Sequence, residues 1–231
     1  MPLTGLTWAR IREHLRKTAP IYLVGAIIMI FISDILYTST RPQIPSDQEV
    51  LVYLVDGYSQ PSLLDDLCAD ALTYGQDMDD SLLTVHAESI PYTDPETDYA
   101  SAYVLMARMA LGDGDVYLTN ANALEALAGN GCCYPLDEWL NEGWLEDLGL
   151  EPWYYTEKDE DTGEENTYIA ALSLDKINAL RENGIFENQG SYLVIASNGT
   201  NIATSRNVVT YMLERLAEGT YAPAATEEPA A

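Results

Sequence analysis

The stretch EVLVYLV, residues Glu49 to Val55, is a short and continuous apolar run that is rich in β-favouring residues. A run of this length and composition predicts a buried strand. The segment that follows, Asp56 to Pro61 (DGYSQP), has the composition of a turn. This strand and the turn after it are the starting point from which the expected fold is built.

Strand and helix patterns alternate on the C-terminal side of this turn. Helical patterns are expected from Leu63 to Leu72, from Asp98 to Leu111 and from Asn122 to Ala128. Strands are expected at Ser81 to His86 and at Asp115 to Leu118. Strands that alternate with helices imply a parallel sheet with right-handed crossovers. The predicted fold class is α/β, a single three-layer domain with a parallel sheet.

A different pattern begins after residue 135. Residues 153–173 read as a hairpin around an acidic turn, and 190–197 as another buried strand. Residues 206–218 predict a final helix. The remaining segment, 219–231, is a Pro/Ala/Glu tail whose composition predicts disorder.

A second long apolar run, Pro20 to Tyr37, follows the basic residues Arg10, Arg12, Arg16 and Lys17. About 18 apolar residues can cross a bilayer as a helix, and basic flanks stay on the cytoplasmic side. Because no Ala-x-Ala site follows the run, an uncleaved anchor is favoured over a cleaved signal peptide. The expected organisation, from the N-terminus, is a cytoplasmic segment 1–19, a transmembrane helix 20–37, a linker 38–48, an extracytoplasmic domain 49–218 and the tail.

The chain is strongly acidic, with 37 acidic and 11 basic residues. Residues 38–231 hold 35 of the acids and 7 of the bases, a net charge near −28. Such a surface repels phosphate backbones, so nucleic-acid binding is excluded as a function.

Three cysteines, Cys68, Cys132 and Cys133, lie in the predicted extracytoplasmic domain. Disulfides form outside the cytoplasm. Because the number of cysteines is odd, at least one thiol stays free or pairs with another chain. A ring between the adjacent pair, a bond from one of them to Cys68, and buried free thiols all remain open. No Cys-x-x-Cys occurs, and His14 and His86 are the two histidines, so no metal site and no cofactor are predicted.

Three segments resemble the extracellular solute-binding proteins of bacterial ABC importers, which have the type II periplasmic-binding fold. They are MARMALGDGDVYLTN (Met106 to Asn120), LEALAGNGCCYPLDEWL (Leu124 to Leu140) and SYLVIASNGTNIATSRNVVTYMLERL (Ser191 to Leu216). Members usually hold the ligand between two lobes. The resemblance here implies about one lobe, carried on a membrane anchor, with the second lobe missing or reduced to the hairpin.

Ligands of open parallel sheets bind beyond the carboxyl ends of the strands. The polar and aromatic residues predicted at these ends, or near them, are candidates for ligand contacts, although turn chemistry alone also explains such residues. The candidates are Asp56, Tyr58, Ser59, Glu88, Tyr92, Thr119, Asn120, Tyr134, Ser197 and Asn198.

An enzyme is not predicted, because the sequence offers no recognisable nucleophile and base. The leading hypothesis is non-catalytic recognition of a solute or partner, within or beside a membrane transport assembly. The alternative is a scaffolding envelope subunit that binds another protein and no solute. Expected partners are the membrane, a transporter permease or other envelope protein, and a second copy of the chain, since a homodimer could rebuild a two-lobed cleft.

Overall fold

The computed structural model describes residues 28–33, 44–92, 99–138, 148–158, 164–185 and 190–218. The chain divides into two units, Met1–Gln43 and Ile44–Ala231. In the first unit, residues 28–33 are helical and exposed. The rest of the predicted anchor, the segment 1–19 and the tail 219–231 lie outside the described residues. Within the described part of the chain, no helix has both the length and the apolar character that crossing a membrane requires.

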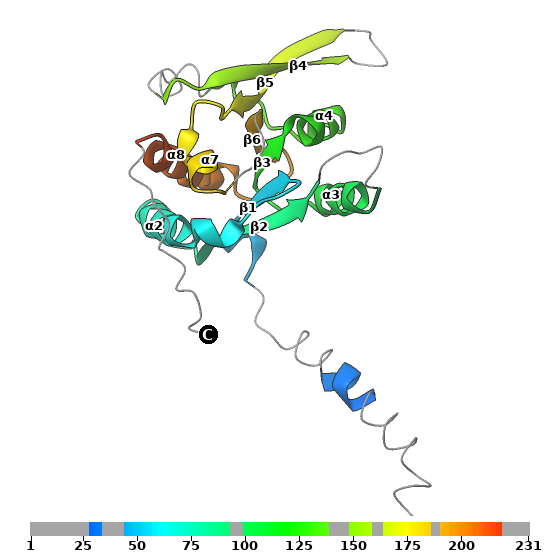
Figure 1. The fold of residues 1–231 in the computed structure, drawn as a ribbon, viewed down its shortest axis with the longest axis vertical. Helices are drawn as coiled ribbons and strands as arrows, with labels where there is room; N and C mark the ends of the chain where they lie inside the picture. Colours follow the sequence, from blue (N-terminus) through cyan, green and yellow to red (C-terminus); the bar gives the residue numbers. More distant parts are fainter. Residues whose placement is uncertain are drawn as a thin grey trace, which may run out of the picture. The chain divides into compact units, whose positions relative to one another are not determined.

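The second unit is an α/β domain built on one six-stranded mixed sheet (Figure 1). The strands are β1 (Glu49–Asp56), β2 (Thr84–Pro91), β3 (Val116–Asn120), β4 (Glu151–Lys158), β5 (Glu165–Ser173) and β6 (Ser191–Ile195). Their order across the sheet is β2-β1-β3-β6-β5-β4. β1 pairs in parallel with β2 and β3, whereas the β3–β6, β6–β5 and β5–β4 pairs are antiparallel.

Helices cover both faces of this sheet and produce three layers (Figure 1). One face packs against α2 (Asp65–Gln76), α7 (Asn178–Glu182) and α8 (Ile202–Ala217), and its core contains Val52, Leu67 and Val208. The other packs against α3 (Tyr99–Leu111) and α4 (Ala121–Gly129), with Tyr53, Leu105 and Leu124 in its core. Two short 3₁₀ helices, η1 (Ser46–Gln48) and η2 (Pro61–Leu64), flank β1. The predicted α/β class with three layers is confirmed.

The parallel arrangement is confirmed for β2, β1 and β3, but the sheet as a whole is mixed. Ile195 at the end of β6 lies opposite Val116 at the start of β3, so β6 runs against its neighbour. The predicted hairpin does form, as β4 and β5, but it extends the same sheet through β6. Two consecutive strands that are parallel neighbours require a crossover that brings the chain back to the opposite end of the strands. The connection from β5 to β6 instead starts and finishes at the same end of the strands, where Leu174 N donates to Ser191 O (2.8 Å).

The first three strands form a doubly wound core. The chain leaves β1 for α2 on one face of the sheet, and leaves β3 for α4 on the other face. Because β1 and β3 are neighbours, their carboxyl ends meet where the connections diverge. Such a topological switch point is the place where open α/β sheets bind ligands.

Candidate functional site

Asp56 and Asn120 are the last residues of β1 and β3, and they meet at the switch point. The Asp56 carboxylate is fully buried and accepts hydrogen bonds from Gly57 N (2.8 Å) and from Asn120 Nδ2 (3.4 Å). Asn120 Nδ2 also donates to Tyr92 O (2.8 Å), and Tyr92 N donates to Asp56 O (3.0 Å). These bonds connect the carboxyl ends of β1, β2 and β3, so this edge of the sheet is pre-organised.

Asn120 also begins α4. Its Oδ1 accepts a hydrogen bond from Ala123 N (3.0 Å), which is the bond of an N-capping side chain. Thr119, one residue earlier, is buried, and its hydroxyl donates to Asn120 O (3.2 Å). The sequence predicts both residues just beyond the third strand, and the structure places them as its last two residues.

A second set of polar groups lies further out on the same edge. Ser59 Oγ and Ser89 Oγ share a hydrogen bond (2.8 Å), and the Gln60 side-chain amide donates to the Tyr58 hydroxyl. The Tyr58 side chain is about half exposed (48%). These hydroxyls and this ring are the groups on the edge that a ligand could contact. We call Asp56, Tyr58, Ser59, Ser89, Tyr92 and Asn120 the carboxyl edge.

Sequence reasoning missed the connection after β5. Ser89, between the candidates Glu88 and Tyr92, lies inside β2, opposite Leu54 of β1. The connection after β5 lies beside the loop after β1, where Gln60 N donates to Ile185 O (3.3 Å). Nothing in the sequence indicated this contact, because it depends on the direction of β5 and β6.

Apart from the buried Thr119, four predicted residues are not part of the carboxyl edge. Glu88 lies within β2, opposite Tyr53, because the second strand ends later than expected. The Glu88 carboxylate is 3.8 Å from Nε2 of His86. Ser197 and Asn198 follow β6 and lie at the opposite edge, where Asn198 Nδ2 donates to Met109 O (2.8 Å).

The position of Ser197 and Asn198 follows from the direction of β6. Since β6 is antiparallel to β3, the carboxyl end of β6 adjoins the amino end of β3. Tyr134 lies at the same opposite edge, where its N–H donates to Ile195 O (2.8 Å). The expectation that these three residues join Asp56 is therefore wrong.

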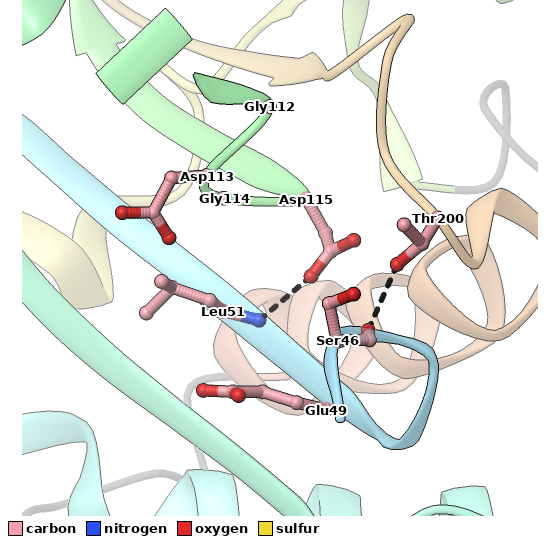
Figure 2. A pocket seen from close by; sticks show the side chains of 8 residues that line it. All are labelled: Ser46, Glu49, Leu51, Gly112, Asp113, Gly114, Asp115 and Thr200. Atoms are coloured by element: carbon pink, nitrogen blue, oxygen red, sulfur yellow. Dashed lines mark hydrogen bonds between the residues drawn. The ribbon is translucent and has the colours of Figure 1, made fainter. Parts of the chain in front are cut away.

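A small hollow occurs at this opposite edge, beside the amino end of β3 (Figure 2). It is lined by Ser46, Glu49, Leu51, Gly112, Asp113, Gly114, Asp115 and Thr200. Its volume of about 40 Å³ leaves room for only a few water molecules, since roughly 10–15 Å³ holds one. The hollow is therefore far smaller than the pockets that hold organic ligands.

Asp115 is the most buried acid that lines the hollow. One of its carboxylate oxygens, Oδ2, accepts a hydrogen bond from Leu51 N (3.0 Å) (Figure 2). Burial raises the pKa of Asp115 to about 6, and the nearby charges of Glu49 and Asp113 act in the same direction, against the bond from Leu51. Although the hollow is acidic, the described residues contain no group of three or more His, Cys, Asp or Glu residues able to hold a metal ion.

Arg108, on α3, pairs with a residue that lines the hollow. Its guanidinium pairs with the Asp113 carboxylate, and Cζ lies 5.7 Å from the centre of the Tyr53 ring. The Tyr53 hydroxyl is buried and, within the described part of the chain, has no hydrogen-bond partner. Burial, followed by the Asp113 charge, raises the pKa of Tyr53. His86 faces two carboxylates, with Nδ1 3.2 Å from Oε1 of Glu49.

The three cysteines are present as thiols. Cys68 belongs to the core on the α2 and α8 face, and Cys133 to the core on the α3 and α4 face. Cys132 packs against that second core and is partly exposed. The sheet therefore separates Cys68 from the adjacent pair. Burial raises the pKa of both Cys68 and Cys133 to about 12, which keeps these thiols protonated.

Comparisons with known proteins gave no relatives for this chain. No protein-family model matches it, and neither a curated protein nor a solved structure matches it.

Proposed function

We propose that this chain is a non-catalytic recognition protein, anchored in a membrane by its N-terminal segment, that binds its ligand at the carboxyl edge outside the cell. The observation that carries the proposal is the meeting of Asp56, Tyr92 and Asn120 where the connections after β1 and β3 diverge. Ligands of open α/β sheets bind at such switch points.

The proposed setting is a membrane transport assembly. The apolar run from Pro20 to Tyr37, preceded by four basic residues, supports the anchor. The resemblance to extracellular solute-binding proteins supports a role in or beside a transporter, with the domain acting as about one lobe. A partner permease would then lie next to the anchored domain.

The proposed solute is small, polar, and neutral or cationic. The exposed hydroxyls of Tyr58 and Ser89, and the half-buried hydroxyl of Ser59, can exchange hydrogen bonds with a sugar, an amino acid or a short peptide. The high negative charge of the chain opposes an anionic solute. The Tyr58 ring adds apolar area against which a solute can stack.

A scaffolding subunit that binds another protein and takes no solute is the second candidate function. The exposure of the Tyr58 ring (48%) favours it, since tyrosine rings are enriched in protein interfaces. A protein partner needs no enclosed pocket and can lie across the open carboxyl edge. The two candidates share one binding edge and differ in the ligand.

Thermal melting of the purified full-length chain, with a panel of sugars, amino acids and short peptides, tests the proposal. A ligand at 100 times its Kd adds about 2.7 kcal/mol to stability. For a domain of this size that is a rise in Tm of roughly 5–10 °C. Tyr58→Ala and Ser89→Ala should reduce the rise, whereas Thr73→Ala, on the exposed side of α2, should not.

Two results would count against solute recognition at this edge. If no solute in the panel raises Tm while the chain is always recovered with the same protein, the scaffolding function is the better account. If a solute raises Tm equally in Tyr58→Ala and Ser89→Ala, the binding site lies elsewhere in the chain.

A further inference from the structure

Helix α3 exposes an apolar face. Its buried residues are Leu105 and Met109, which pack into the core beneath it. On the other side, the exposed fractions are 75% for Tyr99, 76% for Tyr103 and 79% for Leu111. Helices on protein surfaces normally turn a polar face to water. Apolar residues on both sides of a helix are typical of a helix that packs against protein or lipid on both sides.

The exposed residues of α3 form two adjacent rows. At 100° per residue, Tyr99, Tyr103, Met106 and Ala110 fall in one row, and Ala100, Val104, the half-buried Ala107 and Leu111 fall in the next. We call these eight residues the α3 face. Both rows repeat with steps of four, three and four residues, which is the spacing of a seam between two packed helices. The two tyrosine rings alone offer roughly 300 Å² of contact surface.

The α3 face is also uncharged, in a chain with 37 acidic residues. Between Tyr99 and Leu111 the sequence contains no acid, and its single charged residue, Arg108, pairs with Asp113. By contrast, α2 carries Asp65, Asp66 and Asp70. A basic partner would be attracted to the acidic surface elsewhere on the chain. An equally acidic partner meets the least repulsion on the α3 face.

We propose that the α3 face binds the same face of a second copy of this chain, so that two α3 helices pack together across a twofold axis. A second copy carries the same acidic surface, and a twofold interface uses the same patch on both subunits. Each α3 is about 20 Å long, and a stable dimer needs roughly 800 Å² on each subunit. The α3 face with its surroundings supplies the apolar centre of such an interface.

Sedimentation velocity of the purified full-length chain in a mild detergent, over a range of protein concentrations, tests this proposal. The wild-type chain should form a dimer. Tyr103→Glu and Leu111→Glu should each weaken the dimer at least tenfold, because each places a charge in an apolar interface. Tyr103→Phe should retain it.

Thr73→Glu is the matched control, since it adds the same charge at an exposed position of α2. It should change the dimer Kd by less than about threefold. Because Tyr103 and Leu111 are largely exposed in one copy, both variants should fold, and their circular dichroism and Tm should match those of the wild type.

Several results would overturn the proposal. One is a wild-type chain that stays monomeric, and another is a purified complex in which a different protein covers the α3 face. A dimer that survives both Tyr103→Glu and Leu111→Glu would show that the contact is elsewhere, including in the N-terminal segment. Equal weakening by Thr73→Glu would show that added charge, rather than the α3 face, controls association.

Discussion

The side-chain amide of Asn120, at the end of β3, donates a hydrogen bond to the carboxylate of Asp56, at the end of β1, with a nitrogen–oxygen distance of 3.4 Å. The same amide donates to Tyr92 O, which follows β2. One side chain thus connects three strands at the edge where the chain diverges to both faces of the sheet. The geometry of the carboxyl edge depends on this residue.

Replacing Asn120 should destabilise the domain. Asn120→Ala removes the cap of α4 and leaves Tyr92 O and the buried Asp56 carboxylate without this donor. We expect a loss of about 1–3 kcal/mol in the free energy of unfolding, measured by urea denaturation. Asn130→Ala removes a local bond to Ala126 O at the exposed end of the same helix. An equal loss in both variants would contradict the role of Asn120.

Gly114 should tolerate alanine far less well than Gly131. Both have positive φ, 100° and 67°, which disfavours any side chain. A Cβ at Gly114 would lie 2.5 Å from Cδ2 of Tyr53, whereas a Cβ at Gly131 would meet open space. Tyr53 is buried and stacks on Tyr117 (5.6 Å between ring centres), so it has little room to move.

We therefore expect Gly114→Ala to lower the free energy of unfolding by about 1–3 kcal/mol more than Gly131→Ala does, because overpacking adds to the backbone cost. The same urea denaturation measures both variants. Similar losses of stability in the two variants would mean that the backbone conformation of the turn, and not the contact with Tyr53, makes alanine unfavourable at position 114.

Asp115 should make the domain less stable as the pH rises from about 4 to about 6. Its pKa is raised from 3.8 to about 6 by burial, so the folded state holds this proton more tightly than the unfolded state does. Stability then falls over this interval by up to about 3 kcal/mol. Asp115→Asn can still accept the bond from Leu51 N and should lack this contribution.

The difference in the free energy of unfolding between Asp115→Asn and the wild type reports the contribution of Asp115 alone, because both chains share all the other carboxylates. Chemical denaturation at pH 4, 5, 6 and 7 should show the advantage of the variant growing up to about pH 6 and then levelling. If the stability of the variant and of the wild type changed in parallel with pH, the raised pKa of Asp115 would be contradicted.

Asp79 should show the opposite dependence on pH. Its carboxylate accepts bonds from Ser81 Oγ (2.5 Å) and Thr204 Oγ1 (2.8 Å), which lower its pKa to about 2. The stabilisation is present above the unfolded pKa near 3.8 and is lost as the pH falls towards 2. At neutral pH, Asp79→Asn should be less stable than the wild type.

The deficit of Asp79→Asn should shrink below about pH 4, as measured by chemical denaturation. Asp80→Asn, which removes the same charge from the neighbouring exposed position, should show a smaller deficit at neutral pH. A deficit that is constant between pH 7 and pH 3 would show that the Asp79 charge is not the cause.

The sequence predicted the elements whose patterns are local. The apolar run EVLVYLV is β1, and the helical pattern from Asp98 to Leu111 is α3 with a difference of one residue. Asp56, Thr119 and Asn120 were placed together because parallel neighbours end at the same edge, and the structure brings Asp56 and Asn120 into contact. The residues at the carboxyl ends of β1 and β3 therefore predicted the position of the carboxyl edge correctly.

The direction of β6 could not be read from the sequence. The centre of GSYLVIAS, from Leu193 to Ala196, is a continuous apolar run, and such a run reads the same in a parallel or an antiparallel strand. The direction depends on the path from β5, which begins and ends at one edge of the sheet. The misplacement of Ser197 and Asn198, and the omission of the contact between Gln60 and Ile185, follow from this single error.

The exposed face of α3 was also missed, for a different reason. Its apolar pattern predicted a helix, but a pattern that is apolar all round does not indicate which side faces the sheet. Only the packing of Leu105 and Met109 beneath the helix shows that Tyr99, Tyr103 and Leu111 face outward.

Titration calorimetry of the full-length chain with the same panel of sugars, amino acids and short peptides tests the central claim most directly. A neutral or cationic solute should bind the wild type, and Tyr58→Ala, on the carboxyl edge, should weaken that binding. Thr73→Ala, on α2, should leave it unchanged. Absence of binding by every solute, or equal binding by the wild type and Tyr58→Ala, would contradict solute recognition at the carboxyl edge.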